Sequence, residues 1–331
     1  MAGMLGMGTY LGPATAERDE AYVEAAAAFW SAGGRHFDTA ANYRGGRSEQ
    51  ALGRVLPRWP RKAVVVSTKA GYLPMGDGRT EETPQAWFHR TLVRPGILRP
   101  EDVVEGCHVL TPGYLRHQLD TSLEALGLEQ VDVFHLHNPE QQRPSKGPAG
   151  FLEVMREAFE ACEALVAQGK VAAYGCATWD GFRVPPEAED HLSLEALLDV
   201  AEAVAGTHHH FRWIQLPLNL AMPEAWLSPT QEFRGRRMPI LQAALAAGLQ
   251  VQTSASMLQG RLLPQLPPRL VGLLGAGTAA QAALQFTRSV PGVTVTLCGM
   301  SQLAHVQENA AVLELPGVEV GVLRGLFPVR G

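Results

Sequence analysis

Three short segments of the chain carry side chains that together could protonate a carbonyl oxygen. The segments read HFDTAANY at 36–43, STK at 67–69 and HLHNP at 135–139. They supply Asp38, Tyr43, Lys69 and His137, each at or just beyond the end of a β-forming run. Lys69 would pull the pKa of the Tyr43 phenol down from its ordinary value of about 10. Asp38 would keep the lysine charged and aimed, and His137 would hydrogen-bond the same substrate oxygen.

Eight short β-branched or apolar runs recur along the chain, each followed by a helical pattern. They lie near residues 4–10, 35–39, 63–69, 130–137, 171–177, 211–217, 249–255 and 292–298. Eight β-then-α units are typical of a (β/α)8 TIM barrel, an α/β fold whose chemistry lies at the carboxyl ends of the strands. No segment resembles a linker between domains. The sequence therefore predicts a single barrel domain over residues 1–331, with the four chemical side chains at its functional end.

The interval between Lys69 and His137 is longer than a return to the next strand requires. The excess lies at residues 72–109, after the third strand. A loop of this length without regular structure is commonly functional. We expect it to emerge over the mouth of the barrel as a lid, where Trp87 and Phe88 would wall a substrate pocket. The alternative is a surface excursion packed against the side of the barrel.

Strand geometry also predicts a second layer beneath the four residues. Side chains alternate along a strand, so a residue two positions before a lumen-facing one also faces the lumen. His36, Ser67 and His135 should therefore lie one layer below the chemical residues. His135 is either a support or proton relay for His137 or a hydrogen-bonded core histidine, and we favour the core histidine.

Composition fits a soluble enzyme and excludes little else. The chain has 331 residues, 46% of them hydrophobic, and a net charge of -5 with acids and bases interspersed. It shows no basic face for nucleic acid. It also lacks a basic and apolar leader and any run of about 18 apolar residues, so a membrane or secretory role is not indicated and the cytoplasm is expected. Four widely spaced cysteines favour reduced thiols.

Two further patterns have simpler interpretations than a ligand site. The histidines at 208–210 have no second cluster with suitable spacing, so we expect no metal. GAGTAA at 275–280 imitates a dinucleotide fingerprint. However, no strand closely precedes it, and no Asp or Glu lies between Leu270 and Gln307 to hold a ribose. It is better interpreted as the start of a helix.

The pattern DTA..Y..G.SE from Asp38, followed by TK and a strand ending in LH, resembles the aldo-keto reductases. Similar landmarks continue along the chain as GMGTY at 6–10, SLEALGLEQVDVFHLH at 122–137, QGKVAAYG at 168–175, LQG at 258–260 and ENA at 308–310. In that family an Asp, Tyr, Lys and His tetrad reduces carbonyl groups with a nicotinamide coenzyme. The resemblance implies that Asp38, Tyr43, Lys69 and His137 are this tetrad.

The resemblance also implies a coenzyme site. Gln215 matches the glutamine that binds the nicotinamide carboxamide, and Glu308 with Asn309 matches the pair that holds the adenine. The other expected coenzyme contacts are Thr9, Tyr10, Asp38, Ala177, Thr178, Ser254, Gly260, Gly299, Ser301 and His305. NADPH is the expected coenzyme and NADH the alternative. Asn138 joins Trp87 and Phe88 as an expected substrate contact.

Three parts of this site, with five residues in all, depart from the family pattern. Ala177 and Thr178 stand where the family has Ser-Asn, and Ser254 stands where a tyrosine usually stacks on the nicotinamide. Ser301 and His305 stand where Arg or Lys usually grips the 2′-phosphate of NADPH, although Arg261 could reach the phosphates. Two functions are therefore compared. The first is NAD(P)H-dependent reduction of an aldehyde or ketone, or the reverse oxidation of an alcohol. The second is a nucleotide-binding or interaction protein with little turnover.

The complete set of four catalytic residues favours the enzyme, because drift after loss of catalysis would damage that set as readily as the coenzyme positions. The expected partner is a small carbonyl compound. The sequence leaves the physiological substrate, the direction of turnover and the oligomeric state open.

Overall fold

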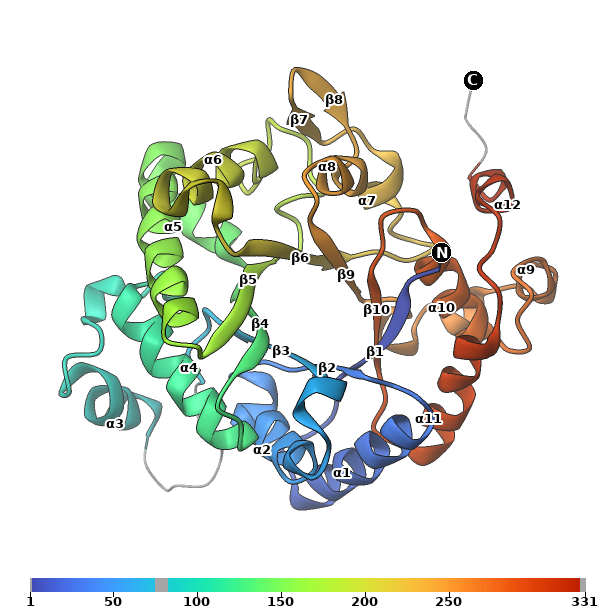
Figure 1. The fold of residues 1–331 in the computed structure, drawn as a ribbon, viewed down its shortest axis with the longest axis horizontal. Coiled ribbons are helices and arrows are strands. Elements are labelled where there is room, and N and C mark those ends of the chain that lie inside the picture. Colours follow the sequence, from blue (N-terminus) through green and yellow to red (C-terminus); the bar gives the residue numbers. More distant parts are fainter. Residues whose placement is uncertain (1, 75–82, 328–331) are drawn as a thin grey trace.

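The computed structural model describes residues 2–74 and 83–327 and contains a closed barrel of eight parallel strands inside a ring of helices (Figure 1). The barrel strands are β1 (Met4–Gly8), β2 (His36–Asp38), β3 (Val65–Ala70), β4 (Val131–His137), β5 (Val171–Ala177), β6 (Phe211–Pro217), β9 (Gln250–Ser254) and β10 (Val295–Gly299). They are hydrogen-bonded in chain order, and β1 closes the barrel against β10. The predicted (β/α)8 TIM barrel is confirmed, with each strand at its expected place.

Helices connect successive strands and cover the outside of the barrel (Figure 1). The longer ones are α1 (Ala16–Ser31), α2 (Arg47–Gly53), α4 (Pro112–Leu126), α5 (Arg143–Ala167), α6 (Leu194–Ala205), α8 (Ile240–Ala246), α10 (Ala279–Ser289) and α11 (Leu303–Ala310). Shorter elements are α3 (Pro84–Phe88), α7 (Glu224–Leu227), α9 (Pro268–Leu273), α12 (Val320–Gly325) and the hairpin of β7 (Gln231–Phe233) and β8 (Arg236–Met238). GAGTAA leads into α10, where the Thr278 side chain caps the helix by accepting from the Gln281 backbone N–H.

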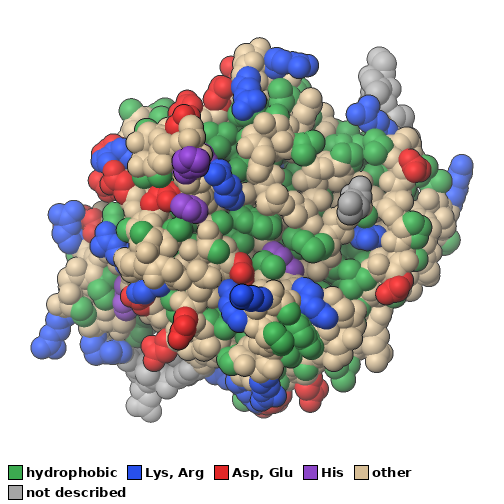
Figure 2. All heavy atoms as spheres, in the orientation of Figure 1, with side chains coloured by type: hydrophobic (Ala, Val, Ile, Leu, Met, Phe, Trp, Pro, Cys, Tyr) green, Lys and Arg blue, Asp and Glu red, His purple; other side chains and the backbone are tan. Residues whose placement is uncertain are grey.

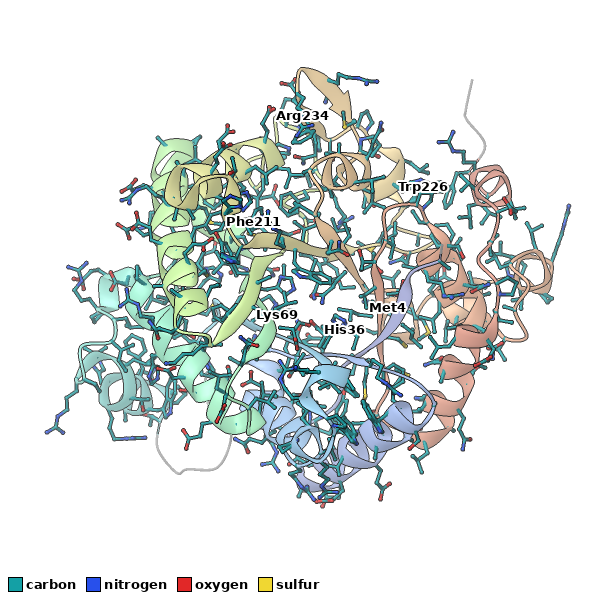
Figure 3. The ribbon with its side chains drawn as sticks, in the orientation of Figure 1. Met4, His36, Lys69, Phe211, Trp226 and Arg234 are labelled. Atoms are coloured by element: carbon teal, nitrogen blue, oxygen red, sulfur yellow. The ribbon has the colours of Figure 1, made fainter. Side chains whose placement is uncertain are left out.

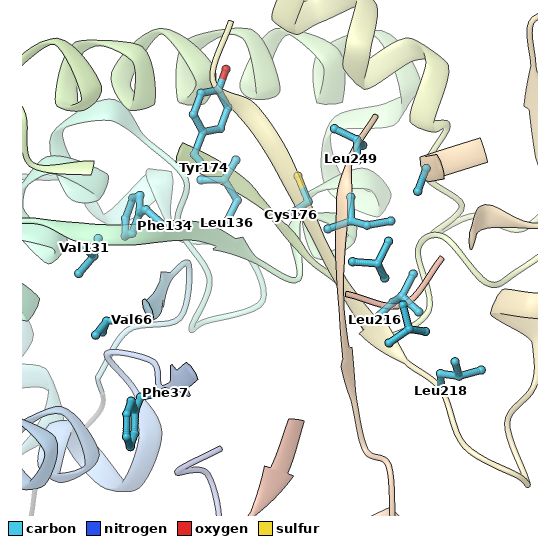
Figure 4. Close-up of a cluster of buried hydrophobic side chains, with 14 of the residues drawn as sticks. Phe37, Val66, Val131, Phe134, Leu136, Tyr174, Cys176, Leu216, Leu218 and Leu249 are labelled. Carbon is cyan, nitrogen blue, oxygen red and sulfur yellow. The ribbon is translucent and has the colours of Figure 1, made fainter. Parts of the chain in front are cut away.

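Side chains alternate along each barrel strand. Apolar side chains therefore face the surrounding helices, and polar side chains face the barrel lumen. Figure 4 shows the apolar layer between the strands and the helices, which includes Phe37, Val66, Phe134, Leu136, Tyr174, Cys176 and Leu216. The intervening residues point inward. Lys69 and His36 lie inside the ring of strands (Figure 3). The strand register places Asp38 beside Ser67 and Lys69 beside His135.

The layer below the chemical residues is a buried hydrogen-bond network centred on Gln252. Its amide oxygen accepts from His135 Nε2 at 2.8 Å, and its amide nitrogen donates to His36 Nε2 at 2.7 Å and Ser67 Oγ at 3.3 Å. Burial lowers the pKa of His36 to about 4 and that of His135 to about 3. Both imidazoles are therefore neutral near pH 7. This is the hydrogen-bonded core histidine that we favoured for His135.

The segment after β3 contains the short helix α3. Figure 1 shows α3 at the periphery of the barrel, outside α4. Trp87 and Phe88 pack there beside Leu92, Leu98 and Tyr114 in a second apolar cluster. The expectation that these two aromatic residues wall the pocket is therefore wrong, because they cover this cluster on the side of the barrel. Residues 75–82 of the expected lid lie outside the described residues.

Charged side chains of both signs share the surface, in line with the mixed charges of the sequence. On the face shown in Figure 2, Lys and Arg are interspersed with Asp and Glu. Within 2–74 and 83–327, no helix is long and apolar enough to cross a membrane. The same ranges contain no cluster of three His, Cys, Asp or Glu residues that could hold a metal ion.

Candidate active site

Four polar side chains converge at the carboxyl ends of β2, β3 and β4. Lys69 Nζ donates to Asp38 Oδ2 at 2.6 Å and to the Thr39 carbonyl oxygen at 2.8 Å. The same ammonium lies 4.7 Å from the centre of the Tyr43 ring, and the Tyr43 and His137 rings lie 5.8 Å apart, edge to face. Tyr43 opens the short 3-10 turn Tyr43–Gly46 after β2. The structure thus brings together the four residues that their strand positions predicted.

Hydrogen bonds on both sides fix the Asp38 carboxylate. Ser67 Oγ donates to Asp38 Oδ1 at 2.7 Å, and Gln215 Nε2 donates to the same oxygen at 2.9 Å. Gln215 Nε2 also donates to Gln252 Oε1 at 2.7 Å. A reversed Gln215 amide would set its oxygen against a carboxylate, so its orientation is defined by charge. Only Gln215 Oε1 is therefore left for a ligand, and it could accept from a carboxamide.

The electrostatics favour a protonated tyrosine and a charged lysine. Burial raises the pKa of Tyr43, and the opposing attraction of Lys69 does not outweigh it. The net downward shift that we expected is therefore wrong, because desolvation of the phenolate dominates. Burial lowers the pKa of Lys69, but Asp38 and Tyr43 together leave it above its usual value.

His137 is a neutral imidazole at this site. Burial lowers its pKa well below the usual value, and the Lys69 charge acts in the same direction. His137 Nδ1 is buried without a hydrogen-bond partner among the described residues. Nε2 is therefore the ring nitrogen available to a ligand. It could donate a hydrogen bond to a carbonyl oxygen or accept one from an alcohol.

A cavity of about 820 Å³ opens above these residues. Among the predicted positions it is lined by Thr9, Tyr10, Asp38, Tyr43, His137, Asn138, Ala177, Thr178, Gln215, Ser254, Gly260 and Gly299. A volume of this size is in the range of ligand and cofactor sites. Lys69 lies beneath the cavity floor, fully buried against Asp38.

Four of the predicted coenzyme residues do not line this cavity. They are Ser301, His305, Glu308 and Asn309, at and beyond the end of β10. The Asn309 side chain is buried and donates from Nδ2 to Cys298 Sγ at 3.3 Å. The Glu308 carbonyl oxygen accepts from Gln281 Nε2 at 3.0 Å. Trp87 and Phe88 are likewise absent from the lining, for the reason given above.

The cavity also has walls that the sequence interpretation missed. Tyr72 lies on His137, with ring centres 5.0 Å apart, and its hydroxyl accepts from Asn138 Nδ2 at 2.9 Å. Glu105 and Trp179 also line the cavity. The position of Tyr72, three residues after Lys69, was a usable signal. No sequence signal pointed to Glu105, because its position depends on how the segment after β3 turns back.

The backbone after β9 forms a tight turn that borders the cavity. Ala255, Leu258, Gln259 and Gly260 have φ values of 55°, 48°, 57° and 85°. The backbone N–H groups of Leu258, Gly260 and Arg261 donate to carbonyl oxygens within this turn, at 2.9, 3.0 and 3.1 Å, so the turn is held by its own hydrogen bonds. The neighbouring Arg261 is the one Lys or Arg among the described cavity residues. This arginine, together with the orientation of Gln215, fits a nicotinamide dinucleotide along β6, β9 and β10.

Comparison with known proteins agrees with this geometry. The profile of the Aldo/keto reductase family matches residues 4–197, which is more than half of the chain. The chain therefore belongs to the aldo/keto reductase family of oxidoreductases.

The individual relatives have low sequence identity to the chain, and their matches cover between 43% and 97% of it. The chain is 29% identical over 306 residues to D-threo-aldose 1-dehydrogenase of a Pseudomonas species, covering 90% of this chain and 85% of the relative. It is 28% identical over 143 residues to NADH-specific methylglyoxal reductase of Escherichia coli, covering 43% and 36%. The crystal structure of an aldo/keto reductase from Klebsiella pneumoniae in complex with NADP and acetate superposes with a TM-score of 0.65 at 21% identity, covering 97% and 89%.

Proposed function

We propose that the protein reduces an uncharged aldehyde or ketone with a nicotinamide coenzyme bound in the cavity, or oxidises the corresponding alcohol. The observation that carries this proposal is the position of the Lys69 ammonium, between the Asp38 carboxylate at 2.6 Å and the Tyr43 ring at 4.7 Å. A phenol beside a fixed cation can release a proton and be stabilised as the phenolate that remains. The coenzyme, when bound, supplies a hydride.

Each residue has one role in this proposal. Tyr43 donates its hydroxyl proton to the carbonyl oxygen and regains a proton from solvent afterwards. Lys69 stabilises the Tyr43 phenolate, and Asp38 keeps Lys69 in place. His137 holds the carbonyl oxygen by donating from Nε2, which orients the substrate for proton transfer. Gln215 Oε1 would accept a hydrogen bond from the nicotinamide carboxamide.

The charges at the cavity favour an uncharged substrate. Glu105, Asp180 and Asp190 line it, against the single guanidinium of Arg261. Asp180 is paired with Arg183 at 2.9 Å, whereas no ion pair joins Glu105 or Asp190 to a described residue. A carboxylate-bearing substrate would meet like charge here. A neutral hydroxyaldehyde should therefore have a higher kcat/KM than a keto acid of similar size.

The coenzyme choice is also part of the proposal. The Klebsiella structure holds NADP, whereas the Escherichia coli relative is named as NADH-specific. We propose NADP(H) for this chain, with NAD(H) as the alternative.

The test is a fluorescence titration of the purified protein with NADPH and NADH, followed by coenzyme consumption with a panel of aldehydes and keto acids. Saturable binding, with turnover of neutral aldehydes that Tyr43→Phe abolishes, is the expected result. Binding of coenzyme without consumption by any carbonyl compound would favour the nucleotide-binding alternative. Binding of neither coenzyme by folded protein would overturn both.

A further inference from the structure

An arginine on α1 reaches the loop that follows β10. Arg18 Nη1 donates to Ser301 Oγ at 2.7 Å, although 283 positions separate the two residues. Ser301 is the position at which the sequence predicted a coenzyme contact without a cation. The barrel closes β1 against β10, so the helix after β1 starts beside the loop after β10. The fold therefore brings a guanidinium to Ser301 from the opposite end of the chain.

The Arg18 side chain lies in a space that a glycine leaves open. A Cβ on Gly12 would lie 2.9 Å from Arg18 Nε, 3.0 Å from its Cδ and 3.2 Å from its Cγ. Gly12 has φ +99°, a conformation that residues with a side chain rarely adopt. Gly12 thus permits both the turn and the path of the arginine. The guanidinium is held over this turn rather than extended into solvent.

Arg18 differs from the two arginines near it in having no acidic partner among the described residues. Asp19 forms ion pairs with both Arg44 and Arg47. No ion pair links Arg18 to any residue that the structure describes, and the one described hydrogen bond of its side chain ends on a neutral hydroxyl. An arginine whose described side-chain hydrogen bond goes to a neutral serine keeps its positive charge and most of its N–H donors available.

The loop that carries Gly12 is rigidly attached. Arg44, whose side chain is 1% exposed, donates to the carbonyl oxygens of Pro13 at 3.0 Å and Thr15 at 3.2 Å. Tyr22 Oη donates to the carbonyl oxygen of Leu11 at 2.8 Å. These bonds fix the start of α1 relative to β1. The position of Arg18 is therefore set by buried contacts that do not involve a ligand.

The pair of Arg18 and Ser301 stands at the edge of the cavity. Leu11 and Gly299 both line the cavity, and a Cβ on Gly299 would lie 3.0 Å from Leu11 Cδ1. Gly12 follows the first of these residues, and Ser301 lies two positions after the second. The pair therefore lies just past the cavity wall that Leu11 and Gly299 form.

We propose that Arg18 and Ser301 bind the 2′-phosphate of NADP(H) and make Arg18 the residue that selects the phosphorylated coenzyme. This inference rests on the proposed function. The guanidinium supplies charge and paired N–H donors to phosphate oxygens. Ser301 Oγ accepts from Arg18, so its own hydrogen is free to donate to the same group. The loop after β10 has Ser301 and His305 where Arg or Lys was expected. Arg18 on α1 thus supplies the missing positive charge.

The experiment compares wild type, Arg18→Met and Arg18→Lys by calorimetric titration at fixed salt. The ligands are NADPH, NADH, 2′,5′-ADP and 5′-AMP. Arg54→Met is the control, because it removes one positive charge from an exposed arginine paired only with Glu20. Arg18→Met should weaken NADPH and 2′,5′-ADP by about 10- to 100-fold and change NADH and 5′-AMP by less than about twofold. Arg18→Lys should be intermediate, and Arg54→Met should match wild type.

The outcomes separate this inference from the proposed function. Equal losses for NADPH and NADH in Arg18→Met would show a structural role for Arg18 and overturn the inference. Unchanged affinity for NADPH would overturn it as well, and in both cases the proposed function would stand. If folded wild type bound none of the four ligands, the proposed function would fail and this inference with it. Circular dichroism of each variant confirms that the barrel is intact.

Discussion

Nε2 of His108 lies 2.7 Å from the carbonyl oxygen of His137 and ties the segment after β3 to the end of β4. Gln142 Nε2 donates to His108 Nδ1 at 2.8 Å, so Nε2 is the nitrogen that carries the hydrogen. The Tyr72 ring fits between the two histidines, 5.1 Å from His108 and 5.0 Å from His137. The segment therefore fixes the backbone and one face of the residue that we propose to orient the substrate.

The first prediction concerns His108. His108→Leu removes the donor to His137 and the shorter of the two bonds that the Gln142 amide makes to this residue, which should cost about 1–3 kcal/mol of unfolding free energy. We expect kcat to fall by about tenfold with a smaller change in KM, since His137 would no longer be held in place. His108→Gln, which can still donate, should recover part of the rate. Steady-state kinetics with thermal unfolding measures both effects.

His117→Leu on α4 is the matched control, because its imidazole has no described hydrogen-bond partner. It should leave kcat unchanged. A His108→Leu variant with wild-type kcat would show that the contact supports packing alone.

The four residues at the strand ends were predictable because strand alternation and barrel topology fix where they point. Asp38, Lys69 and His137 each end an apolar run, and parallel strands must then bring them together. No comparable rule places His108, because its position depends on the path of a long segment between two strands. Secondary-structure periodicity carries no information about such a path.

The positions of Trp87, Phe88 and Arg18 could not be predicted from the sequence, for two different physical reasons. Trp87 and Phe88 were assigned to the pocket because they follow a catalytic strand. Their apolar neighbours Leu92 and Leu98 instead draw them into a separate buried cluster. Arg18 was missed because barrel closure, rather than chain proximity, sets it beside Ser301. Contacts between the first and last βα units are visible only in three dimensions.

The second prediction concerns the proton donor. Tyr43→Phe should keep coenzyme affinity and lower kcat by about 10²- to 10⁴-fold, the usual contribution of a positioned general acid. Because the pKa of Tyr43 is raised, its phenol stays protonated through neutral pH. The reductive kcat/KM of wild type should therefore stay level from pH 6 to pH 9 and fall only in more alkaline buffer.

Tyr10→Phe is the control for that variant, because its ring lies 5.1 Å from Tyr43 but is more than half exposed. It should change KM more than kcat. Turnover of Tyr43→Phe close to the wild-type rate would exclude Tyr43 as the acid.

The third prediction concerns Gln252, which has no contact with the cavity. Gln252 Oε1 accepts a hydrogen bond from Gln215 Nε2 at 2.7 Å, and Gln215 Nε2 in turn donates to Asp38 Oδ1. Gln252→Leu frees Gln215 and leaves His36 and His135 unpaired, so both stability and kcat should fall. Gln285→Leu is the matched control, because this buried glutamine bonds Pro316 and Arg288 far from the tetrad. It should lose stability without losing kcat, and equal kcat in the two variants would contradict a positioning role for Gln252.

The last prediction concerns Glu49, a buried carboxyl on α2. Thr68 Oγ1 donates to Glu49 Oε1 at 2.5 Å, and burial raises the pKa of Glu49 to about 7. In the unfolded chain this carboxyl has its ordinary pKa of 4.5. The folded form therefore binds the proton more tightly, so its contribution to stability is full below pH 4.5 and is lost as the pH rises through 7.

Glu49→Gln keeps an oxygen that can accept from Thr68 and cannot ionise, so the variant should gain stability over wild type as the pH rises. Between pH 5 and pH 8 the gain should be about 2 kcal/mol, measured as the difference in urea unfolding free energy at the two values. Glu140, whose pKa burial also raises to about 7, and the buried histidines are common to both proteins, so their effects cancel in the difference. Glu20→Gln, at an exposed carboxyl paired with Arg54, should show no such trend. An advantage for Glu49→Gln that is constant or shrinks toward pH 8 would mean that Glu49 is already ionised in the folded barrel at pH 5.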